Sequence, residues 1–341
     1  MGAKRVLVTG AGGFIGRWSV PALQSLGYEV HAVLSQRANR GASEDRGASE
    51  ARGVPEQLLG AKIHFADLLD VSSVNALMGE VRPTHLLHFA WIATPGLYWD
   101  SEENFRWAAA GEQLLLSFRS HGGRRVMMAG SCAEYDWSRA EVCDEWTSPL
   151  ADASAAQVSR YSECKLALQR TLADAGRRDH LSTAWGRIFF QFGPYEHPDR
   201  LVPSVIRNLL LNREAPCSHG RQVRSFLHVA DVGAAFAAVL DGELEGPVNI
   251  GSEERITVAE LVGRIGLQIG RPDLLRMGAR PAPANEPLLL VPALHRLRDQ
   301  AHWRPRYTLN QAVSETIAWW RRSLSVDAGN TPGADDRHNQ S

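Results

Sequence analysis

The sequence predicts an α/β fold in which a doubly wound parallel sheet of the Rossmann type carries a smaller C-terminal lobe. Apolar runs suited to strands alternate with amphipathic stretches suited to helices, an order typical of a parallel sheet covered on both faces. The first apolar run, at 5–9, leads directly into the glycine loop 10–16 (GAGGFIG), which opens a helical stretch. A strand, a glycine loop and a helix in this order indicate a dinucleotide site.

The remaining elements are expected to continue this alternation. We expect strands at 5–9, 29–34, 62–66, 84–89, 124–129 and 183–189, and helices near 14–26, 70–80, 102–121 and 153–175. Residues 36–57 interrupt the pattern, because the near-duplicates 40–44 and 46–50 (both RGASE) offer little to a core. We expect a mobile loop at about 36–57 and a disordered tail at 323–341.

Composition narrows the class of protein. The 341 residues are 44% apolar and 22% charged, enough to bury a substantial core. A net charge of -1 gives no electrostatic reason to expect a nucleic acid polymer or a membrane as partner. The first strand leaves no room for a signal peptide, and no apolar run reaches the length of a membrane span, so we expect a cytoplasmic protein. The four cysteines, at 132, 143, 164 and 217, lack metal-ligand spacing; we expect reduced thiols and no metal.

Three glycines of the loop have separate physical roles. Gly10 permits the tight turn, Gly13 lets the backbone approach a pyrophosphate, and Gly16 lets the helix pack against the strand. The N–H groups and the positive dipole end of the following helix attract phosphates.

The end of the second strand bears on the choice of cofactor. A carboxylate there binds the ribose 2′-hydroxyl of NAD, whereas a basic residue accommodates the 2′-phosphate of NADP. This chain has Ser35 and Arg37 and no carboxylate. We therefore favour NADP (NADPH), with NAD as the alternative; in the alternative interpretation Arg37 is a solvated loop residue.

Three residues downstream predict proton-transfer chemistry. Tyr161 and Lys165 are four residues apart and share a helix face, so the lysine is expected to lower the tyrosine pKa. Ser131 follows the strand that begins at Arg125 and offers a hydroxyl to a substrate oxygen.

The glycine loop, Ser131 and the segment 161–165 (YSECK) together resemble the extended short-chain dehydrogenase/reductase family, particularly its sugar-nucleotide epimerases, dehydratases and ketoreductases. The segments 192–195 (FGPY), 224–232 (RSFLHVADV) and 248–251 (VNIG) extend the resemblance over about residues 4–322. The resemblance implies an NAD(P)-binding Rossmann domain at 1–190 and a mainly substrate-binding lobe at 191–322, from which about 221–251 return to the Rossmann domain.

The resemblance also implies the site residues. The catalytic residues would be Ser131, Tyr161 and Lys165. The cofactor-binding residues would be Thr9, Gly10, Gly12, Gly13, Phe14, Ile15, Gly16, Ser35, Arg37, Asp67, Leu68, Phe89, Ala90, Trp91, Tyr161 and Lys165. The substrate-binding residues would be Ser131, Cys132, Ala133, Leu201, Pro216 and Arg224. Asp67 would contact the adenine amino group or cap a helix, and Trp91 would narrow the pocket or fill space.

Several positions depart from the family pattern or allow two interpretations. Dehydratases of the family carry Asp-Glu where this chain has Cys132 and Ala133, so standard dehydration lacks its acid and base. Cys132 is either a catalytic thiol or a buried structural cysteine. Glu134 and Asp136 contact the sugar or, more simply, belong to a solvated turn. Arg224 binds the substrate diphosphate or forms a salt bridge with Asp231.

The sequence thus predicts an NAD(P)H-dependent 4-ketoreductase for a nucleotide-activated 4-keto-6-deoxyhexose. The alternatives are an NAD-dependent nucleotide-sugar 4-epimerase and a non-standard dehydratase that uses Cys132. A non-enzymatic dinucleotide sensor is expected to have lost Tyr161 and Lys165, which this chain keeps. We expect a homodimer paired through helices 102–121 and 153–175, because apolar residues exceed one core-facing stripe. The excess is illustrated by Leu114, Leu115, Leu116 and Phe118.

Overall fold

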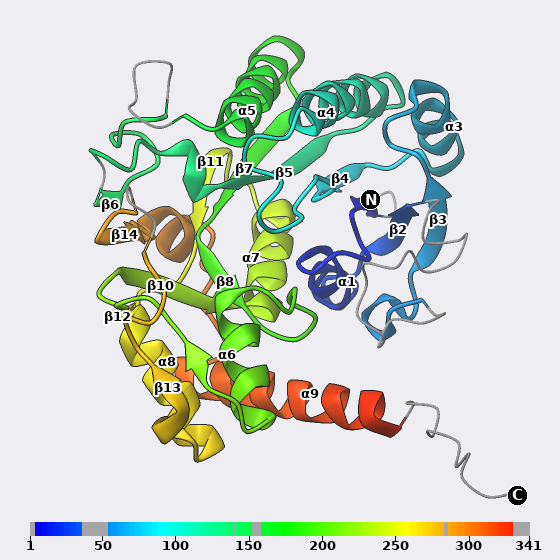
Figure 1. Ribbon diagram of the computed structural model, residues 1–341. Helices are drawn as coiled ribbons and strands as arrows, with labels where there is room; N and C mark the ends of the chain where they lie inside the picture. The colour runs from blue at the N-terminus through cyan, green and yellow to red at the C-terminus, as the bar shows by residue number, and fades with distance from the viewer. Residues whose placement is uncertain (1–3, 36–53, 140, 152–157, 283–285, 330–341) are drawn as a thin grey trace, which may run out of the picture.

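A parallel sheet of seven strands forms the centre of the computed structural model, which describes residues 4–35, 54–139, 141–151, 158–282 and 286–329 (Figure 1). The strand order is β11-β7-β5-β4-β1-β2-β3, and each neighbouring pair runs parallel. The strands are β1 (Arg5–Thr9), β2 (Glu29–Ser35), β3 (Lys62–Ala66), β4 (His85–His88), β5 (Arg125–Ser131), β7 (Ser182–Ile188) and β11 (Gly246–Ile250).

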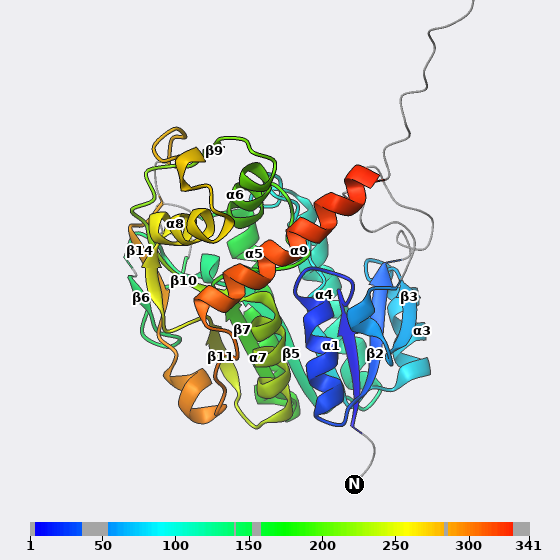
Figure 2. The ribbon, with the colours of Figure 1, turned by 90° about the horizontal axis from the view of Figure 1, so that it is seen from below.

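Helices cover both faces of this sheet, because side chains alternate from one face to the other along each strand. In β1, Val6 and Val8 join the core under α1 and α7, whereas Leu7 joins the core under α3, α4 and α5. Figure 2 shows α1 and α7 side by side. These helices are α1 (Gly16–Ser25), α3 (Val71–Val81), α4 (Glu103–Ser120), α5 (Arg160–Asp179) and α7 (Val229–Asp241).

The C-terminal lobe is built around a second sheet of order β12-β10-β14-β6, with β8 paired to β10, and a small sheet of β13 and β9. Its helices α6, α8 and α9 share an apolar core. The strands are β6 (Val142–Cys143), β8 (Phe190–Phe192), β9 (Ala215–Pro216), β10 (Val223–His228), β12 (Arg255–Thr257), β13 (Leu275–Arg276) and β14 (Leu289–Pro292). The helices and short turns are α6 (Leu201–Leu210), α8 (Val258–Ile269), α9 (Leu309–Gly329), η2 (Glu56–Leu58), η3 (Cys132–Glu134), η4 (Pro272–Leu274) and η5 (Arg296–Gln300).

The α/β class and the parallel sheet are confirmed; most boundaries shift by one or two residues, and the larger differences concern the helix expected near 153–175, the tail and the loop 36–57. The helix expected near 153–175 corresponds to α5, and residues 153–157 of it lie outside the described residues. The Ser159 hydroxyl caps α5 at Arg160 by accepting from the Ser162 N–H at 3.1 Å. Helix α9 runs to Gly329, so the disorder expected from 323 is wrong for 323–329. Residues 36–53 lie outside the described residues. The remaining part of the expected mobile loop, 54–57, leads into η2, whose last residue, Leu58, is buried in the core.

The sheet order reverses between β1 and β4, so a ligand site is expected at the carboxyl ends of these strands. From β1 the chain proceeds to β2 and β3 on one side, and then to β4, β5 and β7 on the other. Ligands of doubly wound sheets bind where the strand order reverses in this way. The glycine loop after β1, the segment after β4 and Ser131 at the end of β5 therefore meet at one edge. In the part of the chain that the structure describes, no helix is both long and apolar enough to cross a membrane.

Candidate active site

The glycine loop has the form that a dinucleotide phosphate requires. Gly10 has a φ of +67°, and a Cβ there would lie 2.7 Å from the Ala90 nitrogen. A Cβ on Gly16 would overlap the carbonyl group of Gly10. Helix α1 begins at Gly16, and no side chain caps its N-terminus. The close backbone approach and the uncapped helix end fit a pyrophosphate.

The other predicted cofactor residues lie on neighbouring segments of the same edge. Ser35 is exposed at the end of β2, and Arg37 lies outside the described residues. Asp67 is exposed after β3 and accepts from the Leu69 N–H at 2.9 Å. The helix-cap interpretation of Asp67 is wrong, because Asp70 caps α3. Gly12, Gly13, Phe14 and Ile15 lie in the loop, Leu68 after β3, and Phe89 and Ala90 after β4.

The Thr9 side chain is engaged within the sheet. Its Oγ1 lies 2.7 Å from Nδ1 of His88 on the adjacent strand, and both residues are buried. Burial, together with the charge of Lys165, lowers the pKa of His88 to about 3, so the imidazole is neutral at physiological pH. This pair fixes the ends of β1 and β4 on either side of the expected ligand site.

Ser131, Tyr161 and Lys165 come together at the carboxyl end of β5. Ser131 is the last residue of β5, and Tyr161 lies in the first turn of α5, where the Ser131 side chain lowers the pKa of Tyr161 against the larger effect of burial. One turn later, Lys165 Nζ donates to the Ala129 carbonyl at 2.8 Å. The same Nζ lies 3.7 Å from the Trp91 ring centroid and 5.8 Å from that of Tyr161.

Burial controls the protonation of this group. It raises the pKa of Tyr161 above its ordinary value, and neighbouring Tyr98 adds to the effect. The expected lowering by Lys165 is therefore not the dominant effect, and Tyr161 is a protonated donor at neutral pH. Burial lowers the pKa of Lys165 to about 7, against the opposing charge of Glu134.

Three aromatic rings surround Tyr161, and two of them, Tyr98 and Trp99, are not among the predicted site residues. The ring centroids of Tyr98, Trp99 and Trp91 lie 5.0, 5.8 and 6.4 Å from that of Tyr161, each nearly perpendicular to it. Trp91 is held by donating from Nε1 to Asn104 Oδ1 at 2.8 Å. No local motif predicts this arrangement, because the segment between β4 and α4 is far from α5 in the sequence.

The two positions after Ser131 carry no acid or base. Cys132 and Ala133 form the start of η3 and are each 7% exposed. Burial raises the pKa of Cys132 to about 12 although Arg224 opposes the shift, so the group is a thiol at neutral pH. All four cysteines are buried and free.

Glu134 is not part of a solvated turn, and that interpretation is wrong. Its side chain is fully buried, accepts from the Ser131 N–H at 2.7 Å and pairs with Arg187 Nε at 2.9 Å. The spacing Ser-x-x-Glu at 131–134 is a capping-box pattern, and this signal could have identified the contact. Asp136 does hold a turn by accepting from the Ser138 N–H at 3.0 Å, but it too is buried.

Arg224 forms a salt bridge, but with Glu286 and not with Asp231, the partner of the alternative interpretation. Its NH2 donates to Glu286 Oε1 at 3.0 Å and to the Pro287 carbonyl at 2.8 Å. Asp231 instead accepts from the backbone N–H groups of Arg306 and Tyr307, so the salt bridge of Arg224 with Asp231 is wrong. Among the described residues, the buried Nε of Arg224 has no hydrogen-bond partner.

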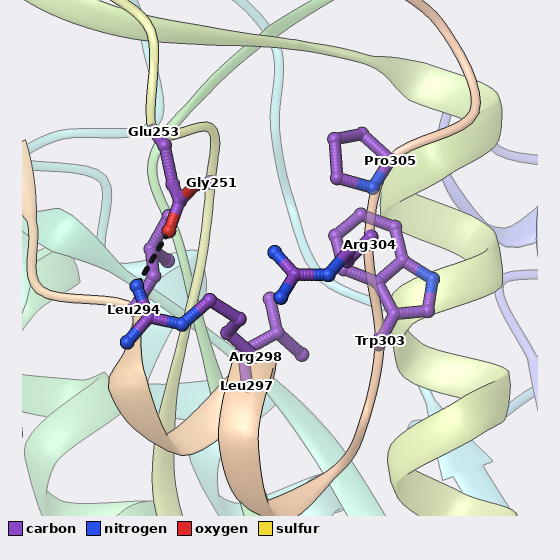
Figure 3. Close-up of a pocket in the computed structure, with 8 residues that line it drawn as sticks. All are labelled: Gly251, Glu253, Leu294, Leu297, Arg298, Trp303, Arg304 and Pro305. Atoms are coloured by element: carbon purple, nitrogen blue, oxygen red, sulfur yellow. Dashed lines mark hydrogen bonds and ion pairs between the residues drawn. The ribbon is translucent and has the colours of Figure 1, made fainter.

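The other two predicted substrate residues lie in the C-terminal lobe. Leu201 opens α6 and is 37% exposed, and Pro216 belongs to β9, which packs against α6. A separate hollow of about 30 Å³ lies beyond the end of β11, between Leu294, Trp303 and Arg304 (Figure 3). It is far below the several hundred Å³ of a typical ligand site and contains none of the predicted site residues.

The apolar excess expected on α4 is smaller than the sequence suggests. Leu114, Leu115 and Phe118 are buried in the chain's own core, and only Leu116 of the four cited residues is exposed, at 49%. These three therefore give no support to pairing between subunits.

Comparisons with known proteins agree with this geometry. Residues 6–251 match the model of the NAD dependent epimerase/dehydratase family. A dTDP-4-dehydro-6-deoxy-D-allose reductase of a Streptomyces species is 25% identical over 341 residues, covering 93% of this chain and 96% of the relative. UDP-glucuronic acid decarboxylase 1 of Xenopus tropicalis is 22% identical, covering 96% of this chain and 74% of the relative.

Solved structures share the fold over nearly their whole length. The UDP-glucose 4-epimerase of Thermus thermophilus in complex with NAD is 26% identical, with a TM-score of 0.71 over 93% of this chain and 99% of its own. The UDP-glucose 4-epimerase of Thermotoga maritima with UDP-glucose, 20% identical, has a TM-score of 0.77 over 94% and 99%. The chain therefore belongs to the NAD-dependent epimerase/dehydratase family and is a nicotinamide-dinucleotide-dependent enzyme of the extended short-chain dehydrogenase/reductase type.

Proposed function

We propose that this enzyme is a 4-ketoreductase that acts on a nucleotide-linked 4-keto-6-deoxyhexose. The observation that carries the proposal is the chemistry beside Ser131. Removing water from a sugar requires an acid and a base, yet Cys132 is a buried thiol with a pKa of about 12 and Ala133 has no functional group. Reducing a ketone requires only a proton donor and groups that orient the carbonyl. The nearly full-length similarity to a 4-keto-deoxyhexose reductase supports the same choice.

Ser131, Tyr161 and Lys165, the catalytic trio, each have a role in this reaction. The Ser131 hydroxyl would hold the carbonyl oxygen, and Tyr161, which burial keeps protonated, would donate the proton to that oxygen. Lys165 would bind the nicotinamide ribose and compensate the charge that develops on Tyr161. The bound reduced nicotinamide supplies hydride to C4 when present. Arg224, whose Nε is unpartnered among the described residues, would bind the substrate diphosphate.

We propose NADPH as the preferred cofactor. Strand β2 ends at Ser35 without a carboxylate, and the nearest acidic residue of that strand, Glu29, stands at its opposite end. Arg37, two residues beyond the described strand, is our candidate for the 2′-phosphate. NAD is the alternative, since the Thermus thermophilus relative was solved with it.

We also propose a homodimer that pairs through α4. Phe105 and Leu116 are 53% and 49% exposed, and their spacing of eleven residues puts both on one face of the helix. Light scattering at micromolar concentration is expected to report a dimer for the native chain and a monomer for Leu116→Glu. A monomeric native chain would reject the proposal.

The decisive assay supplies a 4-keto-6-deoxy sugar nucleotide and, separately, its hydroxylated precursor, while the absorbance of NADPH is followed. We expect the ketosugar to be reduced with one NADPH consumed per sugar and the precursor to remain unchanged. Conversion of the precursor without net cofactor oxidation would instead identify an epimerase, or a dehydratase using Cys132. Stoichiometric NAD released from the purified protein would also favour the epimerase.

A further inference from the structure

The carboxylate of Glu134 lies next to the Ser131 backbone, and both of its oxygens accept hydrogen bonds. One oxygen accepts from the Ser131 N–H at 2.7 Å, and the other accepts from Arg187 Nε at 2.9 Å. The Trp185 indole N–H lies 3.0 and 2.9 Å from the two oxygens. Glu134 and Arg187 have side-chain exposures of 0% and 1%, so water does not compete for these bonds.

The surrounding backbone is shaped around this carboxylate. A Cβ on Gly130 would overlap both the Trp185 indole nitrogen and a Glu134 oxygen, so glycine precedes Ser131 to leave room for them. Arg187 is anchored further by donating to the Glu145 carbonyl and the Tyr135 hydroxyl, each at 3.2 Å. Glu134 is therefore held from β7 and has little freedom to move.

The charge of Glu134 also acts on Tyr161 and Lys165. It raises the pKa of Lys165 against the larger effect of burial, and it adds to the raised pKa of Tyr161. The other groups that face Lys165 are Cys164, neutral His88, Tyr161 and the Trp91 ring. Those that face Tyr161 are Tyr98, Ser131 and Cys132.

We infer that Glu134 is a positioning residue, whose carboxylate fixes the Ser131 peptide and thereby the hydroxyl that this serine presents to the substrate carbonyl. The substrate part of this inference rests on the proposed ketoreductase function. Arg187 pairs with the buried carboxylate and holds it in place, and the charge of Glu134 favours the ammonium form of Lys165. Glu134 itself touches neither substrate nor cofactor.

A double-mutant cycle tests whether Glu134 acts through Ser131. Glu134→Gln is expected to lower kcat about tenfold, the effect of one strong hydrogen bond, with KM nearly unchanged. In a Ser131→Ala background the same change is expected to lower kcat less than about twofold, because the group it positions is absent. An equal loss in both backgrounds would overturn the inference.

Glu145→Gln is the matched control for this cycle. Glu145 is also buried and accepts one backbone N–H, that of Asn249 at 2.9 Å, but it does not contact Ser131. We expect Glu145→Gln to have the same small effect on kcat in both backgrounds. Coupling of this control to Ser131 as strong as that of Glu134 would show a general packing effect and reject a specific role for Glu134.

A second measurement needs no sugar substrate. NADPH binding, followed by tryptophan fluorescence, is expected to weaken as pH rises through the pKa of Lys165, because the ammonium form binds the cofactor better. Without the Glu134 charge that pKa falls, so Glu134→Gln should move the transition to lower pH, whereas Glu145→Gln should not. An unmoved transition in Glu134→Gln would overturn the inference. A shifted transition in an enzyme that fails to reduce the ketosugar would reject the proposed function and leave the role of Glu134 standing.

Glu134→Asp provides the test should the glutamine variant not fold. Aspartate keeps the charge opposite Arg187 but is one methylene shorter and no longer reaches the Ser131 N–H. We expect kcat to fall while the pH of the binding transition stays unchanged. Native kcat in a folded Glu134→Asp would contradict the positioning role.

Discussion

Two arginine–glutamate pairs flank the site, and they differ in how completely they are satisfied. Arg187 Nε and Glu134 Oε2 are 2.9 Å apart next to Ser131, and the two side chains are 1% and 0% exposed. Arg224 NH2 and Glu286 Oε1 are 3.0 Å apart in the C-terminal lobe, and the two side chains are 2% and 27% exposed. The charges of Arg224 and Glu134 both act on the pKa of Cys132, so the thiol lies close to both pairs.

The two guanidinium groups respond to burial in opposite ways. Burial lowers the pKa of Arg187, but Glu134 and Tyr135 outweigh it and leave the pKa above its ordinary value. At Arg224 burial prevails in spite of Glu286, and the pKa stays below its ordinary value. The first pair is therefore electrostatically complete, whereas the second gains from an additional anion. We interpret the first pair as fixed support and the second as a place where a substrate phosphate exchanges with Glu286.

The largest expected effect comes from the predicted proton donor. Tyr161→Phe removes the proton donor and keeps the ring packing, so kcat for the ketosugar is expected to fall roughly 10²- to 10⁴-fold. The dissociation constant of NADPH is expected to change less than about twofold, since the hydroxyl is not its main contact. Steady-state kinetics and fluorescence titration measure the two quantities. Near-native turnover would remove Tyr161 from the chemistry.

The second prediction concerns the stability of the two pairs. Glu134→Ala leaves Arg187 as an uncompensated buried charge and is expected to cost about 3–5 kcal/mol in free energy of unfolding. Glu286→Ala is expected to cost only about 1–2 kcal/mol, because Glu286 is partly exposed and water can replace its carboxylate. Urea denaturation at neutral pH compares them. Equal losses would contradict the distinction between a fixed and an exchangeable pair.

The same two pairs show what the sequence can and cannot predict. Strands β1 and β3 end where expected, at 5–9 and 62–66, because local apolar runs bounded by turns determine them. For Glu134 the sequence favours a solvated turn, because charged residues are usually exposed. Its partner Arg187 is 53 positions away, so the sequence around Glu134 does not indicate the ion pair. For Arg224 the sequence favours a substrate diphosphate and offers nearby Asp231 as the alternative partner, whereas its partner Glu286 is 62 positions away. Partners that only the fold brings together leave no local signal.

The site is predictable where a motif determines the backbone and less so where packing determines the side chains. The glycine loop, Ser131 and the helical spacing of Tyr161 and Lys165 follow from local sequence. The start of α5 differs from the expected one because small and apolar residues also precede Arg160 in the sequence. The capping Ser159 determines where the helix begins. The rings around Tyr161 depend on tertiary contacts across the sheet edge.

The third prediction tests the exchangeable pair directly. Arg224→Ala is expected to weaken the binding of a nucleoside diphosphate such as dTDP or UDP roughly 10- to 100-fold, the effect of one or two charge-assisted hydrogen bonds. Calorimetric titration with the free nucleotide measures it without turnover. Arg207→Ala is the control, because this arginine lies on the same lobe and its guanidinium stacks over Trp320. Unchanged affinity in Arg224→Ala would leave the phosphate without its proposed partner.

A third arginine extends the comparison to the cofactor. Arg37→Ala is expected to weaken NADPH binding about tenfold or more while NADH changes little, because only NADPH carries the 2′-phosphate. Parallel fluorescence titrations give the ratio of the two dissociation constants. An equal loss for both dinucleotides, or a native preference for NADH, would overturn the assignment of NADPH.

The smallest expected effect lies at Cys132, which is close to both pairs. Cys132→Ser keeps a small polar group in nearly the same volume, and the thiol, with its pKa raised to about 12, supplies no base at neutral pH. We expect kcat to change less than about threefold, far below the 10²- to 10⁴-fold loss typical of a general acid or base. The serine hydroxyl needs a hydrogen-bond partner at this buried position, so a modest loss of stability is expected instead. Abolished turnover in a folded Cys132→Ser would assign the thiol to the chemistry and favour a dehydratase or epimerase over a simple ketoreductase.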